Sequence, residues 1–297
     1  MKQSFLKISV QAARDRSENA YAFLYQLPFL NGLEENELAN NEIRLDAYMP
    51  ASSSEETLSG IMKKKKAAEL SGLNINVSEL EYDPSTETEW KKYFKPQKIG
   101  RSLVIKPSWE TYFPASKDIL ITIDPGTAFG TGLHETTRSV LLLLEDMVSE
   151  FKTGGQDLSS MNLLDAGTGS GILAIAAYKM GIRNIKAIDF DYEAVEIATH
   201  NALINGISQK EIRTQTMPIG VVEGTYDIVL ANILSDVLIE AKDKIRSLLK
   251  DKNSRLVLSG ILVKEESKVA DEFQRAGFEL INRVHMNEWC SLLLKLN

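Results

Sequence analysis

From about residue 160 to the end of the chain, short apolar runs alternate with longer segments whose apolar residues recur every three or four positions. The runs are typical of buried strands, and the longer segments are typical of helices. Residues 278–297 indicate two further strands joined at residues 285–288. This alternation predicts a parallel, doubly wound α/β sheet with helices on both faces. The predicted strands cover residues 162–167, 185–191, 226–234 and 254–262, and the predicted helices cover 171–181, 192–206, 235–249 and 264–277.

The first 95 residues show a different pattern: short segments with the apolar alternation of strands are interspersed with segments that have the apolar spacing of helices. Polar residues 83–89, which include Pro84, mark the boundary with the rest of the chain. We therefore predict two domains, residues 1–95 and residues 96–297. The order of elements in the first favours a β-α-β-β-α-β, ferredoxin-like α+β module. Its strands are predicted over residues 4–10, 41–49 and 74–82, and its helices over residues 16–27 and 55–71.

Amino-acid composition and net charge limit the classes of protein to which this chain can belong. The chain is 43% hydrophobic and 25% charged, as soluble globular proteins are, and it has no apolar run of the length that a membrane helix needs. Its net charge of −7 disfavours direct binding to DNA, because phosphate contacts need clustered Lys and Arg. The one cysteine, Cys290, and three scattered histidines predict no metal site. We expect a cytoplasmic monomer that does not enter a membrane.

A glycine-rich turn, LLDAGTGSG, ends the first strand of the predicted sheet. Gly167, Gly169 and Gly171 give the spacing G-x-G-x-G. The dinucleotide fingerprint needs its third glycine where Ile172 stands, so a nicotinamide dehydrogenase is disfavoured. Asp189 follows Gly167 by 22 residues, where an acid can accept hydrogen bonds from two ribose hydroxyls. Asp165 lies just before the turn and can orient a cationic ligand, so a sulfonium-bearing nucleoside fits both acids.

Asn232 lies at the carboxyl end of the strand predicted over residues 226–234, at the edge of the sheet where the glycine turn is expected. Its side-chain carbonyl can hold an amine with the lone pair aimed at an electrophilic methyl group. An asparagine after a strand is commonly only a turn residue. The glycine turn and the acid in register with Asn232 favour a functional role.

Three stretches together resemble one known family. They are DPGTAFGTGLHETT, LLDAGTGSGILAIAA and ANILS, and they resemble the PrmA family, the methyltransferases of ribosomal protein L11. GRSLVIKPSWE and EWC are similar to the same family. The resemblance covers about residues 90–297 and implies a Rossmann-like class I methyltransferase domain, with a seven-stranded sheet and S-adenosyl-L-methionine (SAM) as cofactor. The chain departs from the family pattern in two places. Leu133 and Glu135 stand where the family usually has threonine and proline, and Ser235 stands where it usually has alanine.

The resemblance also implies roles for particular residues. The loop over residues 124–137 would fold over the bound SAM, and Phe129 would cover the site and exclude water. His134 is a candidate base, although the sequence shows no partner that would orient it. The residues that match the family's cofactor contacts are Thr137, Gly167, Gly169, Asp189 and Asn232.

The implied reaction is methyl transfer from SAM to lysine side-chain amines, and to the N-terminal amine, of ribosomal protein L11, free or on the large ribosomal subunit. The first domain would grip that substrate. Because this domain resembles the family only in size and strand order, a SAM-dependent methyltransferase of another protein or of a small molecule stays open. An RNA methyltransferase is disfavoured by the acidic balance. A SAM- or ribosome-binding module without catalysis is the alternative of a different class.

Overall fold

The computed structural model describes residues 4–25, 33–38, 41–50, 65–66, 72–81, 94–124 and 134–297. These residues divide into two compact units, with the division between Phe94 and Lys95. Each unit has its own hydrophobic core.

The first unit is a four-stranded antiparallel sheet with a helix, as the α+β prediction requires. The strand order is β2-β3-β1-β4, and every neighbouring pair is antiparallel. The core lies between the sheet and the helix, where Ile8, Leu24 and Leu45 are fully buried. The elements are β1 (Ser4–Ala13), α1 (Ser17–Tyr25), β2 (Leu33–Leu38), β3 (Glu42–Pro50) and β4 (Asn74–Glu81).

One strand of this unit, β2, was not located from the sequence, and two predicted features cannot be compared. The sequence of β2, LEENEL, is mostly acidic, so it lacks the alternation of apolar residues that predicts a strand. It forms because it pairs along β3. Of the helix predicted over residues 55–71, the structure describes only residues 65–66, which are helical. The predicted boundary over residues 83–89 lies outside the described residues.

The second unit contains the predicted seven-stranded sheet, in the order β10-β9-β8-β11-β12-β14-β13. The five strands from β10 to β12 are parallel, and β14 runs antiparallel between β12 and β13. β10 was not located from the sequence, because IRTQT is largely polar. The strands are β8 (Asn162–Ala166), β9 (Asn184–Asp189), β10 (Ile212–Thr216), β11 (Ile228–Asn232), β12 (Arg255–Leu262), β13 (Phe278–Met286) and β14 (Trp289–Leu296).

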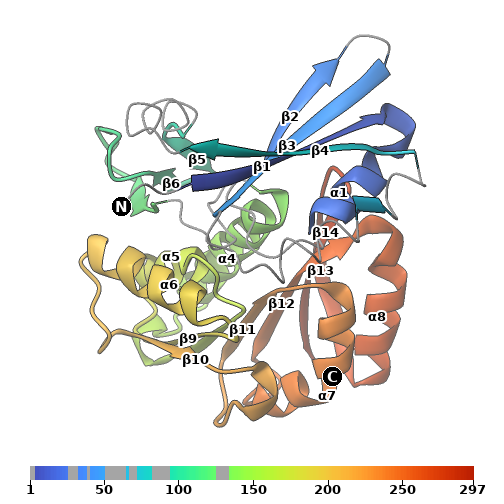
Figure 1. Cartoon of the computed structure of the whole chain (residues 1–297). Coiled ribbons are helices and arrows are strands. Elements are labelled where there is room, and N and C mark those ends of the chain that lie inside the picture. Colours follow the sequence, from blue (N-terminus) through green and yellow to red (C-terminus); the bar gives the residue numbers. More distant parts are fainter. Residues whose placement is uncertain are drawn as a thin grey trace. The chain divides into compact units, whose positions relative to one another are not determined.

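Helices cover both faces of this sheet, because alternate residues of each strand point to opposite sides. Leu163 and Leu230 join the core beneath α4 and α5, whereas Leu164 and Val229 join the core beneath α7 and α8 (Figure 1). Among the described residues, no helix is both long and apolar enough to cross a membrane. The helices are α4 (Glu135–Thr153), α5 (Ile172–Met180), α6 (Tyr192–Ile204), α7 (Ser235–Leu248) and α8 (Glu266–Arg275).

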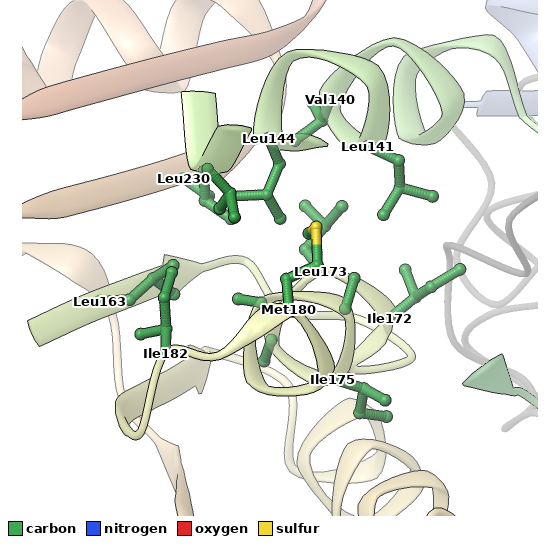
Figure 2. Packing of buried hydrophobic residues seen from close by; sticks show 14 of the residues in the cluster. Val140, Leu141, Leu144, Leu163, Ile172, Leu173, Ile175, Met180, Ile182 and Leu230 are labelled. Carbon is green, nitrogen blue, oxygen red and sulfur yellow. The ribbon is translucent and has the colours of Figure 1, made fainter. Parts of the chain in front are cut away.

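The first of these cores holds α4 in place above the sheet. Figure 2 shows Leu141 and Leu144 of α4 on the side that faces Ile172 and Leu173 of α5. All four side chains are nearly or fully buried. Burying a leucine or isoleucine stabilises the fold by about 1.5–3 kcal/mol, so the start of α4, where His134 and Thr137 lie, is carried on a firmly packed helix.

A small three-stranded sheet precedes α4 and was not predicted. It consists of β5 (Gln97–Ile99), β6 (Leu103–Lys106) and β7 (Ile119–Thr122) in that order. Glu145 of α4 fixes it to the helix: the carboxylate accepts hydrogen bonds from the backbone N–H of Arg101 and from the backbone N–H of Ser102, at 2.8 and 2.7 Å. β7 therefore ends at a fixed place before the segment that leads to α4.

Candidate cofactor and active site

The glycine turn joins β8 to α5 in a shape that only glycine tolerates at its first and last positions. Gly167 has a φ of +74°, and a Cβ atom there would collide with Ile233. Gly171 has a φ of +80°, and a Cβ atom there would lie 3.0 Å from the Cβ of Ala198 on α6. The backbone N–H groups of Gly167 and Thr168 both donate to the carbonyl of Ile188. The turn is thereby fixed against the carboxyl end of β9.

Asp189 ends β9 and contacts the glycine turn directly. Its Oδ2 accepts a hydrogen bond from the N–H of Gly169 at 3.0 Å, and its Oδ1 accepts one from the N–H of Asp191 at 3.1 Å. Burial raises the pKa of Asp189, although these backbone hydrogen bonds act in the opposite direction. Each carboxylate oxygen has a second lone pair, so the side chain can still accept from two hydroxyls. The structure thus places Gly167, Gly169 and Asp189 together.

Asp165 lies at the carboxyl end of β8, beneath the same turn, and is fully buried. Its Oδ2 accepts hydrogen bonds from the hydroxyl of Thr168 at 2.7 Å and from the N–H of Ala174 at 3.2 Å, whereas its Oδ1 has no partner. Burial raises the pKa of Asp165 to about 6. A buried carboxylate with a free oxygen is suited to attract a cationic ligand.

Asn232 and Thr137 lie at the ends of neighbouring elements. Asn232 ends β11 and pairs in register with Ser259 of β12. The Ser259 hydroxyl donates to the carbonyl of Thr136, at 3.3 Å, in the first turn of α4. Thr137 is the next residue, and only 1% of it is exposed. The structure therefore brings Thr137 to the strand beside Asn232, and β11 lies beside β8, which carries the glycine turn.

The side chains of Thr137 and Asn232 each hold a buried oxygen that makes no hydrogen bond. Among the described residues, seven buried side-chain nitrogen or oxygen atoms lack one. Four of them belong to Thr137, Asp165, Asn232 and Ser235, which lie at the carboxyl ends of β8 and β11 or at the starts of α4 and α7. Unpaired buried polar atoms are uncommon in native proteins, and their concentration here fits a polar ligand. The other three atoms belong to Asp46, Arg138 and Arg255.

His134 is the N-cap residue of α4. Its Nδ1 accepts a hydrogen bond from the N–H of Thr136 at 3.3 Å and lies 2.8 Å from the hydroxyl of the same residue. Burial lowers the pKa of His134, so its imidazole is neutral near pH 7. With Nδ1 accepting, a neutral ring carries its proton on Nε2 and has no second lone pair for a base. This geometry supports a capping role; the predicted role in proton transfer stays a prediction.

Phe129 and most of the loop motif lie outside the described residues, which stop at Asp124 and resume at His134. The predicted role of Phe129 as a cover of the site therefore also stays a prediction.

One group of described residues has the donor atoms of a metal site, away from the glycine turn. Donor atoms of Glu266, His285 and Cys290 lie within 4.8 Å of one another. The carboxylate of Glu266 already pairs with His285 at 2.6 Å and with Arg283 at 2.7 Å. Burial and the adjacent Glu266 raise the pKa of the Cys290 thiol to about 12, which keeps it protonated. These contacts make the group a satisfied polar cluster, and the absence of a metal site stays a prediction.

Sequence reasoning missed the residues that support the site. Asn201 of α6 is fully buried and hydrogen-bonded to the glycine turn. Trp289 packs its ring edge-to-face on His134, with ring centroids 5.1 Å apart. Ser139, Ser259 and Ser291 form a buried hydroxyl cluster that joins α4 to β12 and β14. A polar residue on the buried face of a helix is the signal that would have found Asn201.

The strand order, the glycine turn with its acid and the unpaired polar atoms define a class I SAM-dependent methyltransferase. Comparison with known proteins gives the family: the pattern described as Ribosomal protein L11 methyltransferase (PrmA) matches residues 7–297. This chain belongs to that family.

Two relatives and one solved structure illustrate the similarity. The ribosomal protein L11 methyltransferase of Bacillus pumilus is 34% identical over 284 residues, which are 94% of this chain and 86% of the relative. That of Geotalea uraniireducens is 42% identical over 213 residues, which are 70% of this chain and 66% of the relative. The crystal structure of ribosomal protein L11 methylase from Lactobacillus delbrueckii subsp. bulgaricus superimposes with a TM-score of 0.60 at 30% identity, covering 69% of this chain and all of that one.

Proposed function

We propose that this chain transfers methyl groups from SAM to lysine side-chain amines, and to the N-terminal amine, of ribosomal protein L11. Membership of the family supports the substrate. The observation that carries the assignment of the site is the group of unpaired buried oxygens of Thr137, Asp165 and Asn232 around the glycine turn. SAM, when bound, supplies an electrophilic methyl group on a cationic sulfonium.

The chain's residues then have distinct tasks. Gly167 and Gly169 let a ligand approach the backbone, and the Asp189 carboxylate accepts from ribose hydroxyls. The Thr137 hydroxyl bonds the cofactor, and the Asp165 carboxylate favours its positive charge. Each of these groups binds or orients; none needs to change its covalent bonds.

Asn232 orients the attacking amine. A free lysine has a pKa of about 10.4, so roughly 0.1% of it is neutral near pH 7.4. A site that removes water from the amine lowers this pKa, because desolvation disfavours the charged form. The uncharged carbonyl of Asn232 accepts an N–H of the amine without stabilising the ammonium as a carboxylate would. Alignment of the lone pair with the methyl group supplies the rest of the rate enhancement.

The direct test is intact-mass spectrometry of purified ribosomal protein L11 after incubation with this protein and SAM. We expect mass increments of whole methyl groups with the parent and with Asn253→Ala, a control on the exposed turn before β12. We expect none with Asn232→Ala. If L11 stays unmodified although calorimetry detects SAM binding, the substrate is a different protein or a small molecule.

We propose further that the first unit grips the protein substrate, and that the enzyme acts as a monomer in the cytoplasm on L11 that is free or on the large subunit. The separate core of this unit supports an independent binding task. Whole L11 should then be methylated with a KM far below that of a short lysine peptide cut from it. Equal KM values for whole L11 and for the peptide would contradict a role of the first unit in binding the protein substrate.

A further inference from the structure

Asn201 of α6 joins two segments that are far apart in the sequence. Its Nδ2 donates to the carbonyl of Ser170 at 2.9 Å, and its Oδ1 accepts from the backbone N–H of Asp124 at 3.1 Å. Ser170 lies inside the glycine turn, and Asp124 opens the stretch that resembles the family's loop motif. No part of Asn201 is exposed to solvent. One buried amide therefore contacts both the turn that we assign to SAM and the start of that stretch.

The packing around Asn201 holds it against the turn. Ala198, one helical turn earlier on α6, packs on Gly171, where even an added methyl group would lie 3.0 Å away. Asp124 is fixed in turn, since its Oδ1 accepts from the N–H of Ser108 at 2.7 Å. A displacement of α6 would therefore disturb the glycine turn and the backbone at Asp124 together.

Asn205, the C-cap residue of α6, lies one helical turn after Asn201 and provides a comparison. Its Oδ1 accepts from the N–H of Thr122 at 3.0 Å and its Nδ2 donates to the carbonyl of Thr122 at 2.6 Å, as a neighbouring strand would. Residues four apart on a helix rise about 6 Å, and residues two apart on a strand span about 6.6 Å. The spacing of Asn201 and Asn205 on the helix is therefore close to the spacing of their partners, Asp124 and Thr122, at the end of β7. Only Asn201 also reaches the glycine turn.

We propose that Asn201 is a positioning residue of the methyl-transfer reaction, which couples the glycine turn to the backbone at Asp124. Binding of SAM at the turn then stabilises the placement of Asp124, and a misplaced Asp124 weakens SAM binding. This inference rests on the proposed function, in that the glycine turn is taken to bind SAM. Asn205 completes the edge of β7 and takes no part in the coupling.

Replacement of Asn201 by aspartate separates its two hydrogen bonds. The carboxylate still accepts from Asp124, but it cannot donate to Ser170 and instead sets a negative charge beside that carbonyl. Asn205→Asp is the matched control, because it makes the same chemical change one helical turn away. It loses the bonds that Asn205 Nδ2 donates to the backbone carbonyls of Thr122 and Asn201, at 2.6 and 2.8 Å, but it leaves both side-chain bonds of Asn201 in place. Both variants are examined as the full chain, with thermal unfolding to record how far each is destabilised.

We expect Asn201→Asp to weaken SAM binding about tenfold or more in calorimetry, because a buried carbonyl loses its donor. The KM for SAM should rise with it, more than kcat falls. Asn205→Asp should bind SAM within about twofold of the parent even if its melting temperature falls equally. Equal losses of affinity in the two variants, or none in either, would overturn the proposal.

Hydrogen exchange on the unmodified protein provides a second test that does not depend on a variant folding. We expect SAM to slow exchange both in a peptide that covers the glycine turn, residues 165–175, and in one that covers residues 118–124. Slowing in the first peptide alone would contradict the coupling. Slowing in neither, by a protein that still methylates its substrate, would contradict the assignment of the glycine turn itself.

Discussion

Two sets of buried polar side chains in the second unit differ in where their hydrogen bonds are made. Asn201 and Ser291 find partners within the protein: the amide of Asn201 bonds Ser170 and Asp124, and the hydroxyl of Ser291 lies 2.6 Å from two other serine hydroxyls. Thr137 is buried and Asn232 is half-buried, yet each keeps a buried oxygen without a hydrogen-bond partner. An unpaired buried polar group costs about 1–3 kcal/mol.

The positions of the two sets explain the difference. The satisfied side chains lie where helices join strands or turns, and they hold those elements together. The unpaired ones lie at the carboxyl ends of β8 and β11 and at the start of α4, where a doubly wound sheet binds its ligand. The unpaired groups at these positions lower the stability of the protein without ligand, and we infer that hydrogen bonds to a bound ligand restore it. Substitutions in the two sets should therefore have opposite consequences.

The largest effect is expected from Asn232→Ala. It removes an unpaired oxygen, so the free energy of unfolding without ligand should change little. Methyl transfer should fall by about 100-fold or more, because the amine is no longer aligned. Single-turnover transfer from labelled SAM measures the loss, and urea unfolding monitors the fold. A variant that is as fast as the parent would remove Asn232 from the reaction.

Asp165→Asn should separate stability from affinity. The raised pKa of about 6, against 3.8 in a model peptide, means that the folded state binds the proton more tightly than the unfolded chain does. Stability therefore falls as the pH rises from about 4 to about 6, and the buried charge costs about 3 kcal/mol at neutral pH. Asparagine keeps an acceptor for Thr168 and Ala174 and carries no charge.

We therefore expect Asp165→Asn to raise the free energy of unfolding by about 1–3 kcal/mol at neutral pH, with the gain vanishing near pH 4. Affinity for SAM should fall about tenfold, since the cationic ligand loses a buried countercharge. Urea unfolding across this pH range and calorimetry check the two parts separately. An unchanged affinity would make Asp165 purely structural.

His134 tests whether a polar group at the site serves structure or chemistry. Removal of the cap by His134→Ala should cost about 1 kcal/mol of stability, whereas His134→Asn, a good N-cap, should retain stability and nearly the parent rate of methylation. Loss of activity in the asparagine variant would instead support a role as base.

The lowered pKa of His134 gives the pH dependence its sign. The unfolded chain binds the proton more tightly, so this contribution to stability is complete above a pH of about 6.5 and is lost as the pH falls below it. The parent should lose stability relative to His134→Asn on acidification. Unfolding curves of both proteins between neutral and mildly acidic pH measure the difference.

The smallest and most symmetrical comparison is between two serines. Ser291→Ala removes a satisfied hydroxyl, and we expect a loss of about 1 kcal/mol of stability with SAM affinity within about twofold of the parent. Ser235→Ala removes an unpaired one at the start of α7. It should leave stability equal or slightly higher and should weaken binding of SAM or of the protein substrate severalfold. The reverse pattern would contradict the distinction between the two sets.

Hydrophobic periodicity predicted the helices α5 to α8 and most strands of the second unit, because each buries one face in a core. It missed the short strands β5, β6 and β7, and it missed β2 and β10, whose polar sequences are held by their neighbours in the sheet. Spacing and residue type predicted the positions of Gly167, Asp189 and Asn232. The supports of the site, such as Asn201, depend on contacts between segments distant in the sequence. A polar residue on the buried face of α6 marks Asn201 as a candidate, but no local pattern identifies its partners. The capping role of His134 likewise emerged only from the observed geometry of α4.

We infer that the buried oxygens of Thr137, Asp165 and Asn232 lack partners because they form the site of the cofactor. A crystal structure with S-adenosylhomocysteine tests this inference most directly. We expect the ribose hydroxyls to bond the Asp189 carboxylate, the Thr137 hydroxyl to bond the ligand, and the sulfur to lie between the glycine turn and Asn232. A ligand bound elsewhere, with the oxygens of Thr137 and Asn232 still unpaired, would contradict the account.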